Sequence, residues 1–315
     1  IWSPLDSDAK TPLWAITQIP KKELDIPVVQ ISIGILVCTT YFATMYGWGR
    51  PIAHLIFRDT TKYPAFISVI GLTAIILIGG LLNLVELVSK PTLIIIITAG
   101  CASTVYFLIS DRKKIVGSFS PVNSTPWILI LLLLFFFTVI LIPGNSINIF
   151  DDYYFYFGLP VRMLETGTSA GDPFNGAHTI SLGANALLQA FILVFFDFTY
   201  LPAVDGIVLL LSAAALMTDL GRYNGISIPF QLISILTLVV INPMIVNASS
   251  VYGIVLLILA IFMTYQIIQS NEENKDNKYR YFFLIGAFAG AAVALKSHSA
   301  LFLLLIIFSY WIIDN

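Results

Sequence analysis

Residues 126–152 read PWILILLLLFFFTVILIPGNSINIFDD, and this stretch decides the fold. The run 126–143 holds no charged residue, and its length approaches the roughly 20 apolar residues that a membrane-spanning helix needs. Two adjacent carboxylates, Asp151 and Asp152, follow close to the membrane edge, and the aromatic run YYFYF at 153–157 suits the headgroup layer. Charges beside hydrocarbon are costly and are kept mostly where they face a cavity, a partner or a substrate path. The acid pair is therefore the chain's main indication of chemistry.

Composition assigns the chain to the polytopic membrane proteins. Of its 315 residues 58% are hydrophobic and only 11% are charged, against about 25% charged in soluble domains. The mean hydropathy is +0.90. A net charge of -2 gives no reason to expect nucleic acid as a partner. Cys38 and Cys101 both lie inside apolar runs, where a buried thiol is a better interpretation than a disulfide framework.

Apolar runs alternate with polar segments along the whole chain. Residues 1–25 form a polar tail that begins at Ile1 and is too polar for a signal peptide, which is consistent with a trimmed piece. Residues 26–115 contain three expected transmembrane helices, over 26–48, 65–88 and 91–110, bounded by polar segments such as 50–62. Further runs long enough to span or nearly so occupy 126–143, 201–218, 226–246, 250–269, 281–295 and 300–313.

The topology depends on one more apolar segment, Thr179–Phe198, in the loop 144–200. The basic cluster Arg112–Lys114 marks a cytoplasmic loop by the positive-inside rule, so the acid pair is expected on the opposite side. If Thr179–Phe198 spans, the loop 271–280 falls outside. If it does not span, that loop and Arg222 fall inside with Arg112–Lys114.

The periodicity of this segment favours a helix that lies in the membrane surface. His178, Ser181, Asn185 and Gln189 fall within an arc of roughly 80° on a helix, and apolar residues surround them. A single polar stripe of this kind is typical of an interfacial helix. A first juxtamembrane helix is expected over Asp151–Gly167, with Gly167 as its C-terminal cap. The predicted fold is all-α, a transmembrane helix bundle with two juxtamembrane helices in one outer loop.

This layout resembles the GT-C superfamily of membrane glycosyltransferases. The matching pieces are Asp151 and Asp152, then Tyr154, PVRMLETGT at 160–168, DPF at 172–174 and SLGANALLQ at 181–189, and the resemblance covers residues 126 to about 300. A GT-C-like core would thus occupy 116–315. The sequence shows no soluble C-terminal domain of the kind that some relatives carry. Whether its C-terminus is truncated therefore stays open.

The resemblance implies transfer of a sugar from a polyprenyl-phosphate donor to a glycan, lipid or protein acceptor. It also implies a bacterial plasma membrane, an active site on the outer side, a role in cell-envelope polysaccharide synthesis, and a carboxylate of the first outer loop as base. Membrane lipids would be the other partners.

The acid pair fits this chemistry physically. Neighbouring carboxylates repel each other and split their pKa values, which suits a base and its orienting partner. Asp151 and Asp152 are the candidate catalytic residues, and they are also the candidate ligands of a divalent cation such as Mg²⁺ or Mn²⁺, although two carboxylates are too few to argue for a metal. The competing interpretation is helix capping by two solvated acids.

Substrate-binding candidates lie in the same loop and after the run 281–295. Arg162 matches phosphate geometry, although an ion pair with Glu165 is an equal alternative. Lys296 and His298 are expected on the same side as Asp151, where a cation would stabilise the departing phosphate; snorkelling to headgroups is the alternative. The polar stripe adds His178, Asn185 and Gln189 as candidates.

Two other functional classes remain open. A transporter or flippase would also have many apolar spans with scattered polar groups. Against it, the sequence contains no internal repeat and no matching pair of broken helices in two halves. A non-catalytic assembly subunit, in which the acids only cap helices, is the second alternative.

Overall fold

The computed structural model describes residues 27–57, 63–111, 125–141, 158–169, 183–197, 200–241, 250–270, 278–301 and 303–304. Throughout these residues the regular secondary structure is helical, with no strand. The polar tail 1–25, Asp151, Asp152, His178 and most of the run 300–313 lie outside the described residues.

The observed helices follow the apolar runs of the sequence. Five of them are long and apolar enough to cross a membrane, so the protein is an all-helical, multi-pass membrane protein. A π-helical turn, η5, leads directly into α9. The elements are α2 (Pro27–Ile56), α3 (Pro64–Leu84), α4 (Lys90–Ser110), α6 (Thr125–Leu141), α7 (Gly158–Thr166), α8 (Ala184–Leu193), η5 (Val204–Leu209), α9 (Leu210–Tyr223), α10 (Ile228–Ile241), α11 (Val251–Ser270) and α12 (Lys278–Leu295).

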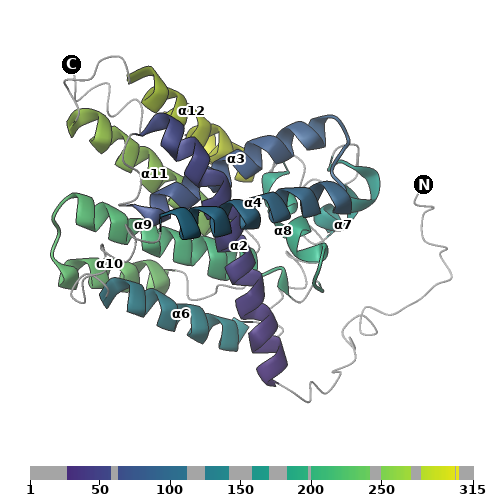
Figure 1. Ribbon diagram of the computed structural model, residues 1–315, viewed down its shortest axis with the longest axis horizontal. Helices are drawn as coiled ribbons and strands as arrows, with labels where there is room; N and C mark the ends of the chain where they lie inside the picture. Colours follow the sequence, from purple (N-terminus) through teal and green to yellow (C-terminus); the bar gives the residue numbers. More distant parts are fainter. Residues whose placement is uncertain are drawn as a thin grey trace.

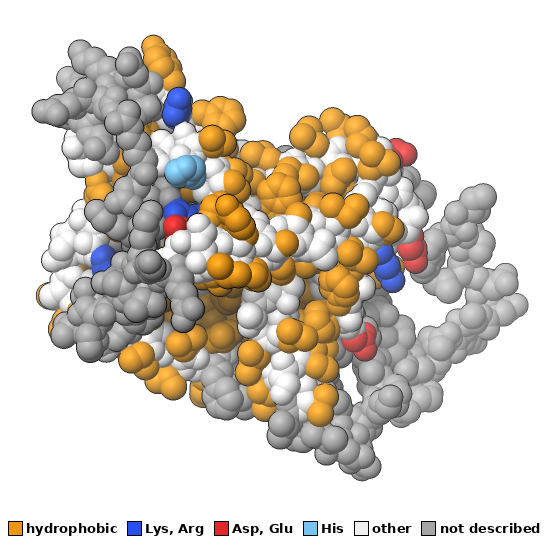
Figure 2. Space-filling view, in the orientation of Figure 1, with side chains coloured by type: hydrophobic (Ala, Val, Ile, Leu, Met, Phe, Trp, Pro, Cys, Tyr) orange, Lys and Arg blue, Asp and Glu red, His pale blue; other side chains and the backbone are white. Residues whose placement is uncertain are grey.

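The surface of the bundle matches a membrane environment. Exposed apolar side chains run along α4, among them Ile95 at 64% and Ile109 at 73% exposed. In Figure 2 the charged side chains in view gather toward the two sides of the molecule, and the middle is mostly apolar. An exposed apolar belt between polar ends is what a bilayer requires.

Helix α2 is longer than the sequence pattern predicts. It continues through Arg50 and Pro51 to Ile56, whereas the polar segment 50–62 was expected to be a loop. The reason is a long-range ion pair, because Arg50 Nη2 donates to Asp111 Oδ2 at 2.7 Å with both side chains largely buried. The guanidinium also lies over the Phe107 ring, 5.7 Å from its centroid. These partners keep the arginine inside the helical bundle.

Close backbone approach joins α2 to α3. A Cβ at Gly49 would overlap the carbonyl oxygen of Ile67, and a Cβ at Gly71 would overlap that of Met45. Small residues at such crossings let membrane helices pack by van der Waals contact, which is their main source of association in lipid.

Contacts define one end of the bundle, here called the α7 end. It comprises the end of α3, the turn 85–89, α7 with residues 167–169, and the start of α8. Val88 N donates to Gly167 O at 3.0 Å, which joins the turn to the end of α7. In Figure 1 α7 lies at the right-hand edge of the bundle, far from the α9–α10 turn at the left.

Other contacts define the opposite end. Asp219 accepts hydrogen bonds from the amides of Ala65 and Phe66, and Arg280 Nη1 donates to Leu55 O at 3.0 Å. The end of α9 also meets the end of α11, where the Tyr223 and Ser270 hydroxyls share a hydrogen bond. The start of α12 thus lies with the ends of α2, α9 and α11, the arrangement expected if Thr179–Phe198 does not span.

Helix α8 occupies a different place from the one that its polar stripe predicts. Its ten residues extend about 15 Å, half the roughly 30 Å of a bilayer core. Gly183 lies beside Asn83, and Leu187 contacts Gly79 one turn further along α3. Residues 184–192 are all buried. Helix α8 therefore neither spans nor lies on the surface; it inserts among the helices of the bundle.

Candidate functional site

The turn between α3 and α4 holds the end of α7 in a fixed place. Gly167, the predicted cap, has φ +84° and donates its amide to Met163 O at 3.0 Å, which ends the helix. A Cβ at this position would overlap the Glu86 carbonyl oxygen. Glu86 is itself left-handed, with φ 58°. The prediction of Gly167 as a C-terminal cap is confirmed, and the close approach shows why no larger residue fits.

Asn83, in the last turn of α3, is the main polar contact between this helix and the residues after α7. Its Oδ1 accepts from Ser169 N at 2.7 Å, from Thr168 Oγ1 at 3.1 Å and from Ser169 Oγ at 3.3 Å. Thr168 and Ser169 are buried. The sequence analysis did not select Asn83, although a lone asparagine in an apolar run is a signal that could have been used.

Arg162 and Glu165 lie on α7, a short helix within the loop 144–200. Glu165 is exposed, and Arg162 is half-buried. Helix α7 begins at Gly158 rather than at Asp151 within the described residues, so the first juxtamembrane helix is described only over its second half. Nothing described therefore brings Arg162 together with the acid pair.

The polar stripe of α8 faces the protein interior. Asn185 is 3% exposed and Gln189 is 1% exposed, although both were expected to face the headgroup layer. Gln189 Oε1 has no hydrogen-bond partner within the part of the chain that the structure describes. The prediction of an exposed stripe is wrong because periodicity shows which side chains share a face and not what that face contacts.

Asp205 joins the start of η5 to the start of α11. Its carboxylate accepts from Val251 N at 3.1 Å and from Gly253 N at 3.3 Å, so it caps α11 across the bundle. Lys296, just after α12, acts electrostatically on this carboxylate. Lys296 therefore lies close enough to the starts of η5 and α11 to interact electrostatically with this buried acid. His298, two residues later, is exposed.

The segment between α8 and η5 carries a cluster of aromatic rings. Phe196 meets Phe195 and Tyr200 at centroid distances of 6.3 and 6.0 Å. Burial raises the pKa of Tyr200, and the Asp197 carboxylate adds to the rise. The Tyr200 phenol therefore stays protonated to a higher pH than an ordinary tyrosine does.

The described residues contain no group of three His, Cys, Asp or Glu side chains that could hold a metal ion. The two carboxylates on which the divalent-cation hypothesis rests lie outside the described residues.

Comparisons with known proteins identify no relative. No family model, no curated protein and no solved structure matches the chain. The all-helical, multi-pass membrane architecture is therefore the level at which the protein is classified.

Proposed function

We propose that the protein is a membrane glycosyltransferase that moves a sugar from a polyprenyl-phosphate donor to an acceptor at the α7 end. The observation that carries the proposal is the placement of α7 and α8. Both are too short to span, and both are anchored beside the end of α3. Two short helices held at one end of the bundle are the arrangement such an enzyme needs to present the acids of the same loop to a lipid headgroup.

The roles follow from the chemistry of the side chains. Asp151 and Asp152 supply the base that takes the proton of the acceptor hydroxyl. General-base catalysis of this kind typically raises a reaction rate by about 10²–10⁴-fold. Arg162 binds the donor phosphate through parallel hydrogen bonds, with Glu165 as its neighbour on α7. Lys296 and His298 balance the negative charge of the departing lipid phosphate.

The test of the base uses purified protein in nanodiscs with a radiolabelled polyprenyl-phosphate sugar, and it measures release of polyprenyl phosphate. Asp151→Asn, Asp152→Asn and the double variant are compared with Asp197→Asn, which neutralises an exposed acid after α8. We expect at least one of the first three to lose roughly 10²-fold or more in turnover and the Asp197 variant to keep it. Unchanged turnover in the double variant would remove the base assignment.

The orientation is tested separately with a membrane-impermeant maleimide on intact cells. Glu86→Cys, Glu165→Cys and His298→Cys should react from outside, whereas Gly225→Cys and Ser270→Cys should react only after the membrane is opened. All five positions are exposed in the structure. Labelling of the two groups from the same side would contradict the topology.

One observation favours a flippase as the second candidate. A short helix inserted into a bundle, with buried polar side chains, is also how carriers build a substrate site, and α8 buries Asn185 and Gln189. The discriminating variant is Gln189→Leu. A flippase would lose translocation of a fluorescent lipid-linked substrate in liposomes, whereas a transferase that binds its donor through Arg162, Lys296 and His298 would keep its turnover.

A further inference from the structure

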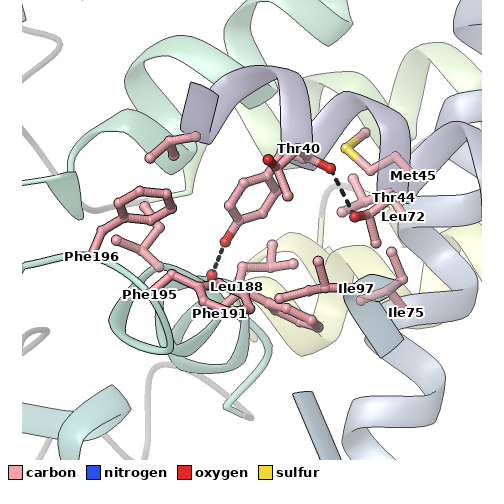
Figure 3. Close-up of a pocket in the computed structure, with 13 residues that line it drawn as sticks. Thr40, Thr44, Met45, Leu72, Ile75, Ile97, Leu188, Phe191, Phe195 and Phe196 are labelled. Atoms are coloured by element: carbon pink, nitrogen blue, oxygen red, sulfur yellow. Dashed lines mark hydrogen bonds between the residues drawn. The ribbon is translucent and has the colours of Figure 1, made fainter. Parts of the chain in front are cut away.

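An apolar pocket lies where the inserted α8 meets α2, α3 and α4. The hollow is narrow and partly open to the surface of the bundle. Phe195 and Phe196 lie at one end of the lining and Met45 and Leu72 at the other, as Figure 3 shows. Hence the pocket extends along the helices from the aromatic segment after α8 into the bundle.

The walls leave little for a polar ligand to bind. The Tyr41 hydroxyl donates to the Leu188 carbonyl of α8, and the Thr44 hydroxyl donates to Thr40 O at 2.7 Å. These are the dashed bonds of Figure 3. Ile75, Ile97 and Phe191 complete an otherwise apolar lining. Because these two hydroxyls already have protein partners, the chemistry of the walls favours hydrocarbon.

The inner end of the pocket lies at the depth of the bilayer core. Leu72, in its lining, is eleven residues before Asn83 at the α7 end, which places it about 16 Å along α3 from that end. The mouth continues into lipid-facing surface, because Phe195 is 52% exposed and Leu36, next to the lining residue Val37, is 55% exposed. Phospholipid chains are the surrounding solvent at this depth.

We propose that this pocket binds one acyl chain of a bilayer phospholipid. An apolar hollow left empty would forfeit the dispersion contacts of its lining, and water has too few polar partners there. Mass action favours the phospholipid over any scarce lipid carrier, because bilayer lipid is the most concentrated hydrocarbon available at the mouth. The acyl chain fills the space between α8 and α2 and so supports α8, the inserted helix. This binding is independent of sugar transfer.

The test is photolabelling of the full chain in nanodiscs of phosphatidylethanolamine and phosphatidylglycerol. A small fraction of the lipid carries a diazirine in one acyl chain, and labelled residues are mapped by mass spectrometry. The filling variant Ile97→Trp places a large ring in the pocket. Its matched control is Ile95→Trp on the same helix, which faces outward at 64% exposed.

We expect wild type and the Ile95 variant to be labelled at Leu188, Phe191 and the facing residues of α2. The Ile97 variant should lose this labelling and keep that of outward-facing side chains. Val37→Phe fills the pocket from the α2 wall and repeats the test if the Ile97 variant does not fold. Absence of pocket labelling in the wild type would overturn the proposal, as would equal labelling in the filled variants. If polyprenyl phosphate reduced the pocket labelling and excess phospholipid did not, the assignment of the bound chain to a bilayer phospholipid would be overturned.

Discussion

Asn83→Leu should loosen the residues just after α7 from the end of α3 while leaving the bundle intact. Leucine is close to asparagine in size but accepts no hydrogen bond, so the substitution removes all three bonds to Thr168 and Ser169. The matched control is Asn83→Asp. All three bonds end on Oδ1, and a carboxylate keeps an acceptor in that place.

The magnitude follows from the bonds themselves. A protein hydrogen bond contributes about 0.5–1.5 kcal/mol net, and a buried amide left without a partner costs about 1–3 kcal/mol. The Ser169 amide has the shortest of the three bonds, 2.7 Å, and its residue is buried. We therefore expect the local opening free energy of residues 167–169 to fall by about 2 kcal/mol, which corresponds to roughly thirtyfold faster exchange.

Hydrogen–deuterium exchange of the purified protein measures this opening directly. Peptides covering 158–169 should exchange faster in the Leu variant, and peptides covering α11 should not change. The Asp variant should behave as wild type at neutral pH, since charge-assisted hydrogen bonds are at least as strong as neutral ones. Unchanged exchange in the Leu variant, or equal acceleration in the Leu and Asp variants, would refute the assignment of Asn83 as the anchor.

Two further predictions concern stability in detergent. Gly167→Ala should lower the midpoint of thermal unfolding, because alanine at φ +84° is strained and its Cβ meets the Glu86 carbonyl; Gly158→Ala, with open space around it, should change the midpoint little, and equal effects would contradict this. For the buried Arg50–Asp111 pair, Arg50→Met alone should destabilise by about 3–5 kcal/mol, and adding Asp111→Leu should restore much of that loss. A double variant no better than the single one, in urea or thermal unfolding, would show that the pair is not coupled.

Hydropathy alone predicted the long spans well. The run expected to begin at Ala65 is α3 from Pro64, and the run from Pro91 is α4 from Lys90. Such bounds are local, because Pro64 and Pro91 suit the first helical turn and Ser89 makes a capping box with Thr92. The extension of α2 past Arg50 was not predictable in this way, because its cause is an acid 61 residues away.

The candidate site was predictable only in part. The sequence located the loop and the Gly167 cap, since both depend on residue type and short spacing. It did not indicate that Asn185 and Gln189 turn inward, because an apolar surround is equally consistent with lipid and with other helices. It also missed Asn83, whose partners are 85 and 86 residues further along the chain.

The placement of α8 makes the N-terminal helices part of the unit that holds the loop 144–200. Tyr41 of α2 bonds the Leu188 carbonyl of α8, and Asn83 of α3 bonds the residues after α7. Asp219 of α9 caps α3 at the opposite end. These hydrogen bonds join the helices before residue 115 to those after it at both ends of the bundle. Changes in α2 or α3 should therefore reach the loop that carries the acid pair through these hydrogen bonds.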